Sequence, residues 1–112
     1  MMSQSPRLLL FLLAAGALMP VNLGAAPPGG PSAEDNYKTH CMVCHTATGD
    51  SPIAIMNFAD GKWKKGSAVK NIAKVIANGM TSSAMMPFKD KLSESEILAI
   101  AKYVRAFDKR LK

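Results

Sequence analysis

The second half of the chain contains two segments in which apolar residues recur at helical spacing. The first begins at Ser67 and ends at Asn78-Gly79, a pair typical of a left-handed C-cap. Its apolar face is formed by Val69, Ile72, Ala73 and Ile76. We therefore predict a helix that starts at Ser67 and ends at Asn78.

The segment after residue 92 has the clearest helix signals. Ser93 and Glu96 have the spacing of a capping box, and Leu92 and Ile97 occupy the two positions of a hydrophobic staple. Its apolar face contains Ile97, Ile100, Ala101, Val104 and Phe107. Basic residues follow at 109, 110 and 112, where they complement the helix dipole.

A third helix is predicted from Ala33 to Cys41. Ser32 can cap it, with Asp35 three residues later, and Tyr37 and Cys41 lie on one helical face. No segment alternates with a period of two, so we expect an all-α domain with three main helices. Two long loops, 46–66 and 80–91, separate them, with a short helical turn expected around residues 53–58. Loops of this length in so small a domain indicate that they wrap something other than protein.

Residues 1–25 have the layout of a secretory signal peptide. Arg7 precedes an apolar run of 12 residues from Leu8 to Met19, and the small residues Gly24 and Ala25 follow. An uncleaved membrane anchor is the alternative, but the run is shorter than the roughly 20 residues that a spanning helix needs. We therefore predict a cleaved signal at 1–25, a flexible linker at 26–32 and one domain at 33–112. The mature protein is expected in the periplasm.

The composition fits a small basic globular domain. The chain has 112 residues, 14 basic and 8 acidic side chains, a formal charge of +6 and 48% hydrophobic residues, which excludes wholesale disorder. Removal of 25 residues, Arg7 among them, leaves 87 residues and a charge of +5. Two cysteines are too few for a disulfide-rich scaffold, although a domain of this size usually needs a staple.

Both cysteines lie in one short motif, Cys41-Met42-Val43-Cys44-His45. This C-x-x-C-H spacing is the attachment signature of c-type haem. Two thiols at i and i+3 can each add to a vinyl group on one porphyrin edge, and the adjacent imidazole can face the iron. A thioredoxin-type disulfide would need a βαβ context, and a structural zinc site would need four ligands, which His40 would have to complete.

The chain resembles the small bacterial class I c-type cytochromes. The resemblance rests on residues 37–45, which include the motif, and on the segments 76–79, 84–93 and 103–105. It implies an all-α class I cytochrome c fold around one covalent haem c, with thioethers at Cys41 and Cys44 and iron coordinated by His45. It also implies a one-electron carrier rather than an enzyme, although such a chain can serve as a redox subunit of one.

In that family the sixth iron ligand is a methionine on the loop before the last helix, with Phe three residues later and Leu seven residues later. Met85 matches both distances, to Phe88 and Leu92, whereas Met86 is followed by the Pro that is common after the ligand. We therefore predict Met85 as the axial ligand, with Met86 as the alternative. Other methionines, such as Met56 and Met80, are interpreted as core filler.

Three further residues take interpretations from the resemblance. Pro52 is similar to the family's loop proline, whose carbonyl orients the proximal histidine, here His45. Trp63 lies in the loop where similar proteins place a donor to a haem propionate, and simple core packing is the other interpretation. His40 is on the proximal side and is expected in a solvated or capping role.

Lysines at 62, 64, 65, 89 and 91 lie in the two long loops. A basic rim around a haem edge would steer redox partners with acidic docking surfaces. The expected partners are a donor dehydrogenase or membrane complex and an acceptor oxidase or reductase. We expect a monomer that binds no nucleic acid and stays out of the membrane after signal cleavage. An enzyme or gas sensor with an open sixth iron site is the alternative function.

Overall fold

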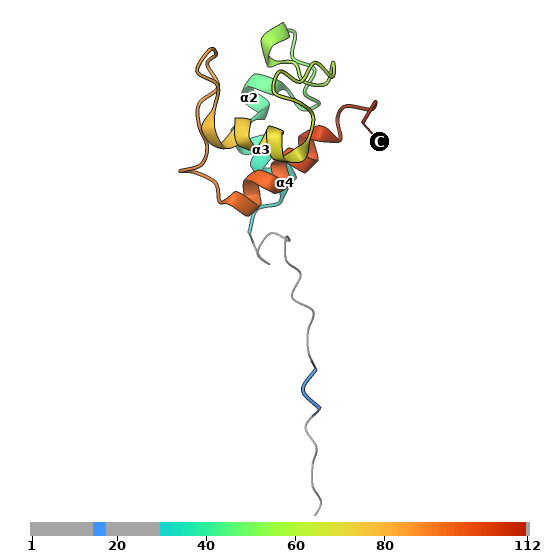
Figure 1. Ribbon diagram of the computed structural model, residues 1–112, viewed down its shortest axis with the longest axis vertical. Coiled ribbons are helices and arrows are strands. Elements are labelled where there is room, and N and C mark those ends of the chain that lie inside the picture. The colour runs from blue at the N-terminus through green and yellow to red at the C-terminus, as the bar shows by residue number, and fades with distance from the viewer. Residues whose placement is uncertain (1–14, 18–29, 112) are drawn as a thin grey trace, which may run out of the picture.

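The computed structural model describes residues 15–17 and 30–111, and it is helical (Figure 1). Its elements are α1 (Ala33–His40), α2 (Met42–His45), the 3-10 turn η1 (Ala54–Met56), α3 (Val69–Asn78) and α4 (Glu94–Arg105). No strand occurs among these described residues. The prediction of an all-α domain with three main helices is confirmed, and α2 and η1 are short additions to it.

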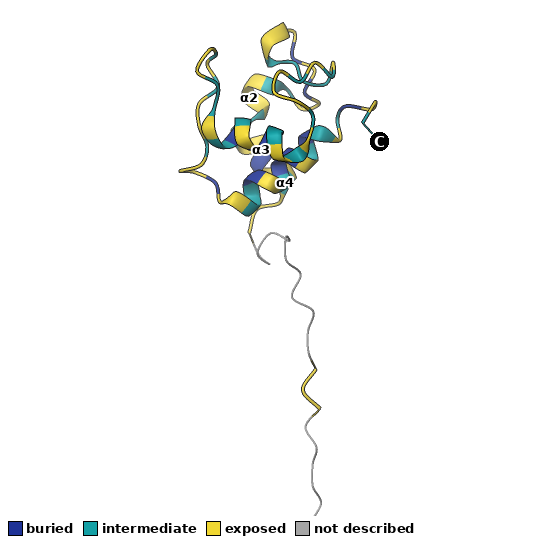
Figure 2. Cartoon of the chain, in the orientation of Figure 1, coloured by how far each residue is buried: buried dark blue, intermediate teal, exposed yellow. Residues whose placement is uncertain are grey.

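Helix α4 forms the centre of the packing, because it contacts both α1 and α3. Ile100 and Ala101 of α4 are fully buried, and Tyr37 of α1 is 1% exposed. The buried apolar core consists of Tyr37, Ile72, Ala73, Ile76, Leu92, Ile97, Ile100, Ala101 and Val104. Figure 2 shows buried residues where α3 crosses α4, while the long loops around them are mostly exposed or intermediate.

Both predicted capping boxes are present. The Ser32 hydroxyl accepts a hydrogen bond from the Asp35 amide, and the Asp35 carboxylate accepts one from the Ser32 amide. Ser93 and Glu96 exchange the same pair of bonds at the start of α4. The staple residues Leu92 and Ile97 are buried. Local sequence signals therefore define the starts of α1 and α4.

The predicted start of α3 at Ser67 is wrong by two residues. The helix begins at Val69, and Ala68 precedes it in an extended conformation without a side-chain cap. The Ser67 carbonyl instead accepts a hydrogen bond from Arg105 Nε of α4, at 2.8 Å. The predicted end is confirmed, because Gly79 follows Asn78 with a φ of 67°.

Two long loops, 46–66 and 80–91, extend from this helical base. The loop 46–66 contains η1, within the expected turn at 53–58. The loop 80–91 returns along the end of α3, where Phe88 N donates to Ile76 O and Lys89 N donates to Ala77 O. These bonds satisfy carbonyls that the helix end leaves without intrahelical partners.

Apart from residues 15–17, the predicted signal peptide, 1–25, lies outside the described residues, as does most of the predicted linker, 26–32. Within the described ranges, no helix has the length and apolar character required to cross a membrane.

Candidate functional site

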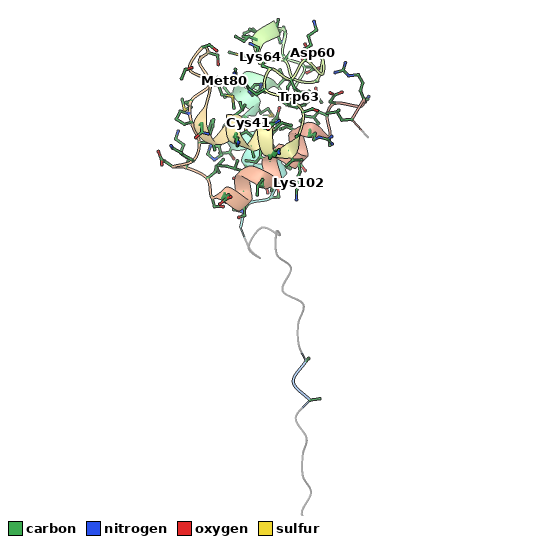
Figure 3. The ribbon with its side chains drawn as sticks, viewed as in Figure 1. Cys41, Asp60, Trp63, Lys64, Met80 and Lys102 are labelled. Atoms are coloured by element: carbon green, nitrogen blue, oxygen red, sulfur yellow. The ribbon has the colours of Figure 1, made fainter. Side chains whose placement is uncertain are left out.

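A cavity of about 650 Å³ lies between the helices and the two long loops. Its size is typical of a site for a drug-sized ligand or cofactor. Apolar residues of α3 and α4 form part of its wall, namely Ile72, Val75, Ile76, Ile100 and Val104. The chemistry-bearing residues Cys41, Cys44, His45, Trp63, Met80, Met85 and Met86 also line it. Figure 3 labels Cys41, Trp63 and Met80, which come from three separate segments.

The junction of α1 and α2 presents the cysteine motif to this cavity. Cys41 caps α1 by donating its amide hydrogen to Tyr37 O at 2.9 Å, and the amides of Cys44 and His45 donate to Cys41 O. The buried Tyr37 hydroxyl donates to Thr46 O at 2.6 Å, which fastens the end of the motif to α1. The two cysteines are not joined in a disulfide; Cys41 is half-buried and Cys44 is exposed.

The chemistry of Cys41 is unlike that of a redox-active C-x-x-C thiol. Burial, and then the charge of Cys44, raise the pKa of the Cys41 thiol to about 11. Reactive cysteines of the thioredoxin kind have a lowered pKa, because the thiolate is the nucleophile. The alternative of a thioredoxin-type disulfide therefore lacks both its expected fold and its expected thiol chemistry.

The described residues also bear on the zinc alternative. Within residues 15–17 and 30–111, no group of three or more His, Cys, Asp or Glu side chains is arranged to hold a metal ion. His40 is half-buried, packs edge-on against Phe88 at 6.0 Å between ring centres, and lines the cavity. It does not complete a four-ligand cluster with the motif.

His45 is held by a backbone carbonyl in the loop 46–66. Its Nδ1 lies 2.5 Å from the carbonyl oxygen of Met56. A carbonyl only accepts hydrogen bonds, so Nδ1 carries the proton and Nε2 keeps a free lone pair for a metal. The expectation that Pro52 orients His45 is therefore corrected. Pro52 is exposed, and the 3-10 turn η1 brings the carbonyl of Met56 to the imidazole instead.

Trp63 lines the cavity, but its indole N–H has a protein partner. Nε1 donates to Asp108 Oδ2 at 2.9 Å, across 45 residues of sequence. An indole has only this one donor, so its bond to Asp108 agrees with packing, the second of the two interpretations of Trp63. Its ring stacks on Phe58 at 5.6 Å, and Phe58 in turn lies 5.2 Å from the His45 ring.

Asp108 is a site-supporting residue that the sequence analysis missed. It is 2% exposed, and it also accepts hydrogen bonds from the Arg110 backbone and side chain. These bonds from Arg110, and then the bond from Trp63, lower the pKa of the Asp108 carboxyl to about 2. The network ties the loop 46–66 to the end of the chain. The carbonyl of Met56 was missed for a simpler reason, because a backbone acceptor leaves no signal in the sequence.

The two candidate methionine ligands differ in burial. Met85 is half-buried and packs against the core, whereas Met86 is 53% exposed and its sulfur lies 3.8 Å from Lys91 Nζ. The loop that carries them is closed by a bond from Met80 N to Met85 O at 3.0 Å. Both side chains line the cavity, and the difference in burial favours Met85 as a ligand inside it.

The donor set fits a c-type haem. The cavity combines an apolar wall, two cysteines three residues apart, an imidazole with a free Nε2, and a thioether from the facing loop. A c-type haem is held by thioether bonds to two cysteines and by iron ligands such as histidine and methionine. The arrangement of the described residues therefore suits this group.

Comparisons with known proteins place the chain in the same class. The family model described as cytochrome c oxidase, cbb3-type, subunit III matches residues 29–104. A solved structure, the KustC0563 c-type cytochrome, is 31% identical with a TM-score of 0.57. That match covers 69% of this chain and 98% of the other. No curated protein matches the chain significantly.

The chain therefore belongs to the c-type cytochromes. Members of this family transfer electrons and carry covalently bound haem c with iron. The predicted family and the all-α cytochrome c fold are confirmed.

Proposed function

We propose that this chain is an exported, monohaem c-type cytochrome that passes single electrons between a redox donor and an acceptor. The observation that carries the proposal is the meeting of Cys41, Cys44 and His45 with a methionine loop around one cavity of about 650 Å³. One attachment motif in the chain supports one haem. When bound, the haem supplies a one-electron Fe(III)/Fe(II) couple.

Each site residue has a separate task in this proposal. Cys41 and Cys44 form the two thioether bonds, and His45 offers Nε2 to the iron while Met56 O holds Nδ1. Met85 provides the second axial ligand, a neutral thioether that favours Fe(II) and raises the potential relative to two histidines. The apolar wall from α3 and α4 keeps water away and lowers the local dielectric.

The charges around the cavity support an acidic redox partner. The exposed lysines on its lining are Lys62, Lys64, Lys65 and Lys91. They would speed the encounter with an acidic docking surface by electrostatic steering. We propose a dehydrogenase or membrane complex as donor and an oxidase or reductase as acceptor. The matched family description names an oxidase subunit, which favours an oxidase as acceptor.

We further propose that the mature protein is a periplasmic monomer that neither binds nucleic acid nor stays in the membrane. The signal-like layout of residues 1–25 supports export. Purification of the periplasmic fraction and N-terminal sequencing test this part, with Ala26 as the expected first residue.

The electron-transfer proposal is tested by optical spectroscopy of the purified mature protein. We expect the weak near-infrared charge-transfer band of methionine–Fe(III) coordination, and little binding of carbon monoxide by the reduced protein. The intact mass should exceed the chain mass by one haem, with no titratable thiol. Rapid binding of carbon monoxide would instead support the alternative, a sensor or enzyme with an open sixth iron site.

A further inference from the structure

A second hollow, of about 450 Å³, lies on the side of α3 that faces away from α4's buried surface. Side chains of α3 at positions 71, 74, 75 and 78 line it, and their spacing places them on one helical face. Lys65 from the preceding loop and the segment 79–82 from the following one complete the lining.

The hollow has defined walls. A Cβ built at Gly66 would lie 2.8 Å from Asn71 Nδ2, so the Asn71 amide lies close against the preceding loop. On the other side, Gly79 turns the chain with a φ of 67°, and Ser83 N donates to Met80 O to close the turn that carries Thr81 and Ser82. The helix and two loops thus form a three-sided recess.

The charge of this recess is positive. Lys65 and Lys74 line it, and no acidic side chain does. All eight acidic residues of the chain lie in the described segment 30–111, and within it neither lysine forms an ion pair with any of them. The carbonyls of residues 75–77 at the end of α3 accept bonds from Gly79, Phe88 and Lys89. These bonds partly offset the negative end of the α3 dipole, which would otherwise oppose an anion there.

We propose that this recess binds a small multivalent oxyanion, of the size of pyrophosphate or larger. Two ammonium groups supply charge-assisted bonds, and the amides of Asn71 and Asn78 and the hydroxyls of Thr81 and Ser82 supply further donors. A liquid water molecule occupies about 30 Å³, so a recess of this volume holds considerably more than a single phosphate.

The recess adjoins the cavity of the cysteine motif, because Lys65 and Met80 line both. A bound anion would place negative charge beside that cavity and would favour Fe(III) over Fe(II) in a haem held there. This consequence rests on the proposed function. It predicts that the anion lowers the reduction potential of the protein.

Binding is tested by titrating inorganic pyrophosphate into the ¹⁵N-labelled full-length mature protein at low and at moderate salt. We expect saturable chemical-shift changes confined to residues 65–66, 71–82 and their neighbours, with affinity that falls as salt screens the lysines. Replacing one lysine, in the variant Lys74→Gln, should weaken binding about fivefold, the scale of one exposed ionic contact.

Lys70→Gln is the matched control. Lys70 is an exposed lysine of the same helix that does not line the recess. If both variants lost the same affinity for pyrophosphate, the effect would be general charge screening, and the proposal would be overturned. Chemical-shift changes spread over all lysines without saturation would overturn it in the same way. Acetate at the same ionic strength should give no saturable shifts.

A separate measurement tests the link to redox function. The reduction potential should fall on addition of pyrophosphate, and this shift should shrink in Lys74→Gln but not in Lys70→Gln. Saturable binding with an unchanged potential would contradict the redox consequence and leave the anion site standing. A protein without a redox couple would contradict the proposed function, whatever the binding result.

Discussion

At the scale of single residues, the neighbouring methionines Met85 and Met86 differ in how far their side chains are buried. Met85 is half-buried against the core, and Met86 is 53% exposed beside Lys91. A ligand to a cavity-bound iron must face inward, and a neutral thioether needs no solvation that would draw it outward.

We therefore expect Met85→Leu to abolish the near-infrared methionine–iron band, to lower the reduction potential and to open the iron to carbon monoxide. Met86→Leu is the matched control, with the same change in side chain one residue later, and should retain the band. If only the Met86 variant loses the band, Met86 is the ligand.

A second prediction at this scale concerns Asp108. Hydrogen bonds from Arg110, and then from Trp63, lower its pKa to about 2, below the ordinary 3.8. A lowered folded-state pKa means that the stabilisation is complete above the unfolded pKa and is lost as the pH falls through the folded one. Protonation of Asp108 should therefore destabilise the wild-type protein as the pH falls from about 4 to about 2.

Asp108→Asn should be less stable than wild type at neutral pH. Its free energy of unfolding should also fall less than that of wild type between about pH 4 and pH 2. Chemical unfolding followed by circular dichroism at several pH values measures both. Asp90→Asn, a change at an exposed carboxyl, serves as the control. An unchanged acid dependence in Asp108→Asn would show that this network does not contribute.

At the scale of secondary-structure elements, the end of α3 is coupled to the methionine loop. Gly79 has a φ of 67°, and a Cβ there would lie 2.5 Å from the carbonyl oxygen of Met85. The same carbonyl accepts the bond from Met80 N that closes the loop. The helix end therefore positions the residues next to the proposed ligand.

We expect Gly79→Ala to destabilise the fold by about 1–3 kcal/mol, the usual cost of a strained backbone position. It should also weaken the methionine–iron band, because the Met85 carbonyl must move. Thermal unfolding and the near-infrared spectrum of the same sample measure the two effects. A stable variant with an unaltered band would contradict this coupling.

At the scale of the whole molecule, the apolar core is small and one side of it faces the cavity. Nine buried apolar residues form the core in the described part of the chain. Five of them also line the cavity of about 650 Å³, namely Tyr37, Ile72, Ile76, Ile100 and Val104. A domain of this size usually needs a staple in addition to its core. A group attached in the cavity would complete the packing of α3 and α4.

The double variant Cys41→Ser, Cys44→Ser should therefore contain no covalent haem and should unfold at much lower temperature than wild type. Pyridine haemochrome spectra and circular dichroism measure these two properties. Val43→Ser is the matched control inside the motif, because Val43 is 88% exposed and the change keeps both thiols. A double variant as stable as wild type would show that the core suffices alone.

The sequence by itself determined those helix ends that have local capping signals. It also determined the chemistry of the site, because the key residues are concentrated in one motif. Capping at Ser32 and Ser93, the turn at Gly79 and the apolar face of α4 depend on neighbours within a few residues, so their pattern predicts them. The C-x-x-C-H motif likewise needs only adjacent residues, and the family comparison agrees with it.

Only the tertiary structure decided which group holds each site residue. Met56 O rather than the Pro52 carbonyl accepts from His45, Asp108 accepts from Trp63, and Ser67 O, ahead of α3, accepts from Arg105. These partners are 11, 45 and 38 residues apart, so no local pattern records them. Side-chain donors bind whichever acceptor the folded chain brings within reach, and only the tertiary fold determines which acceptor that is.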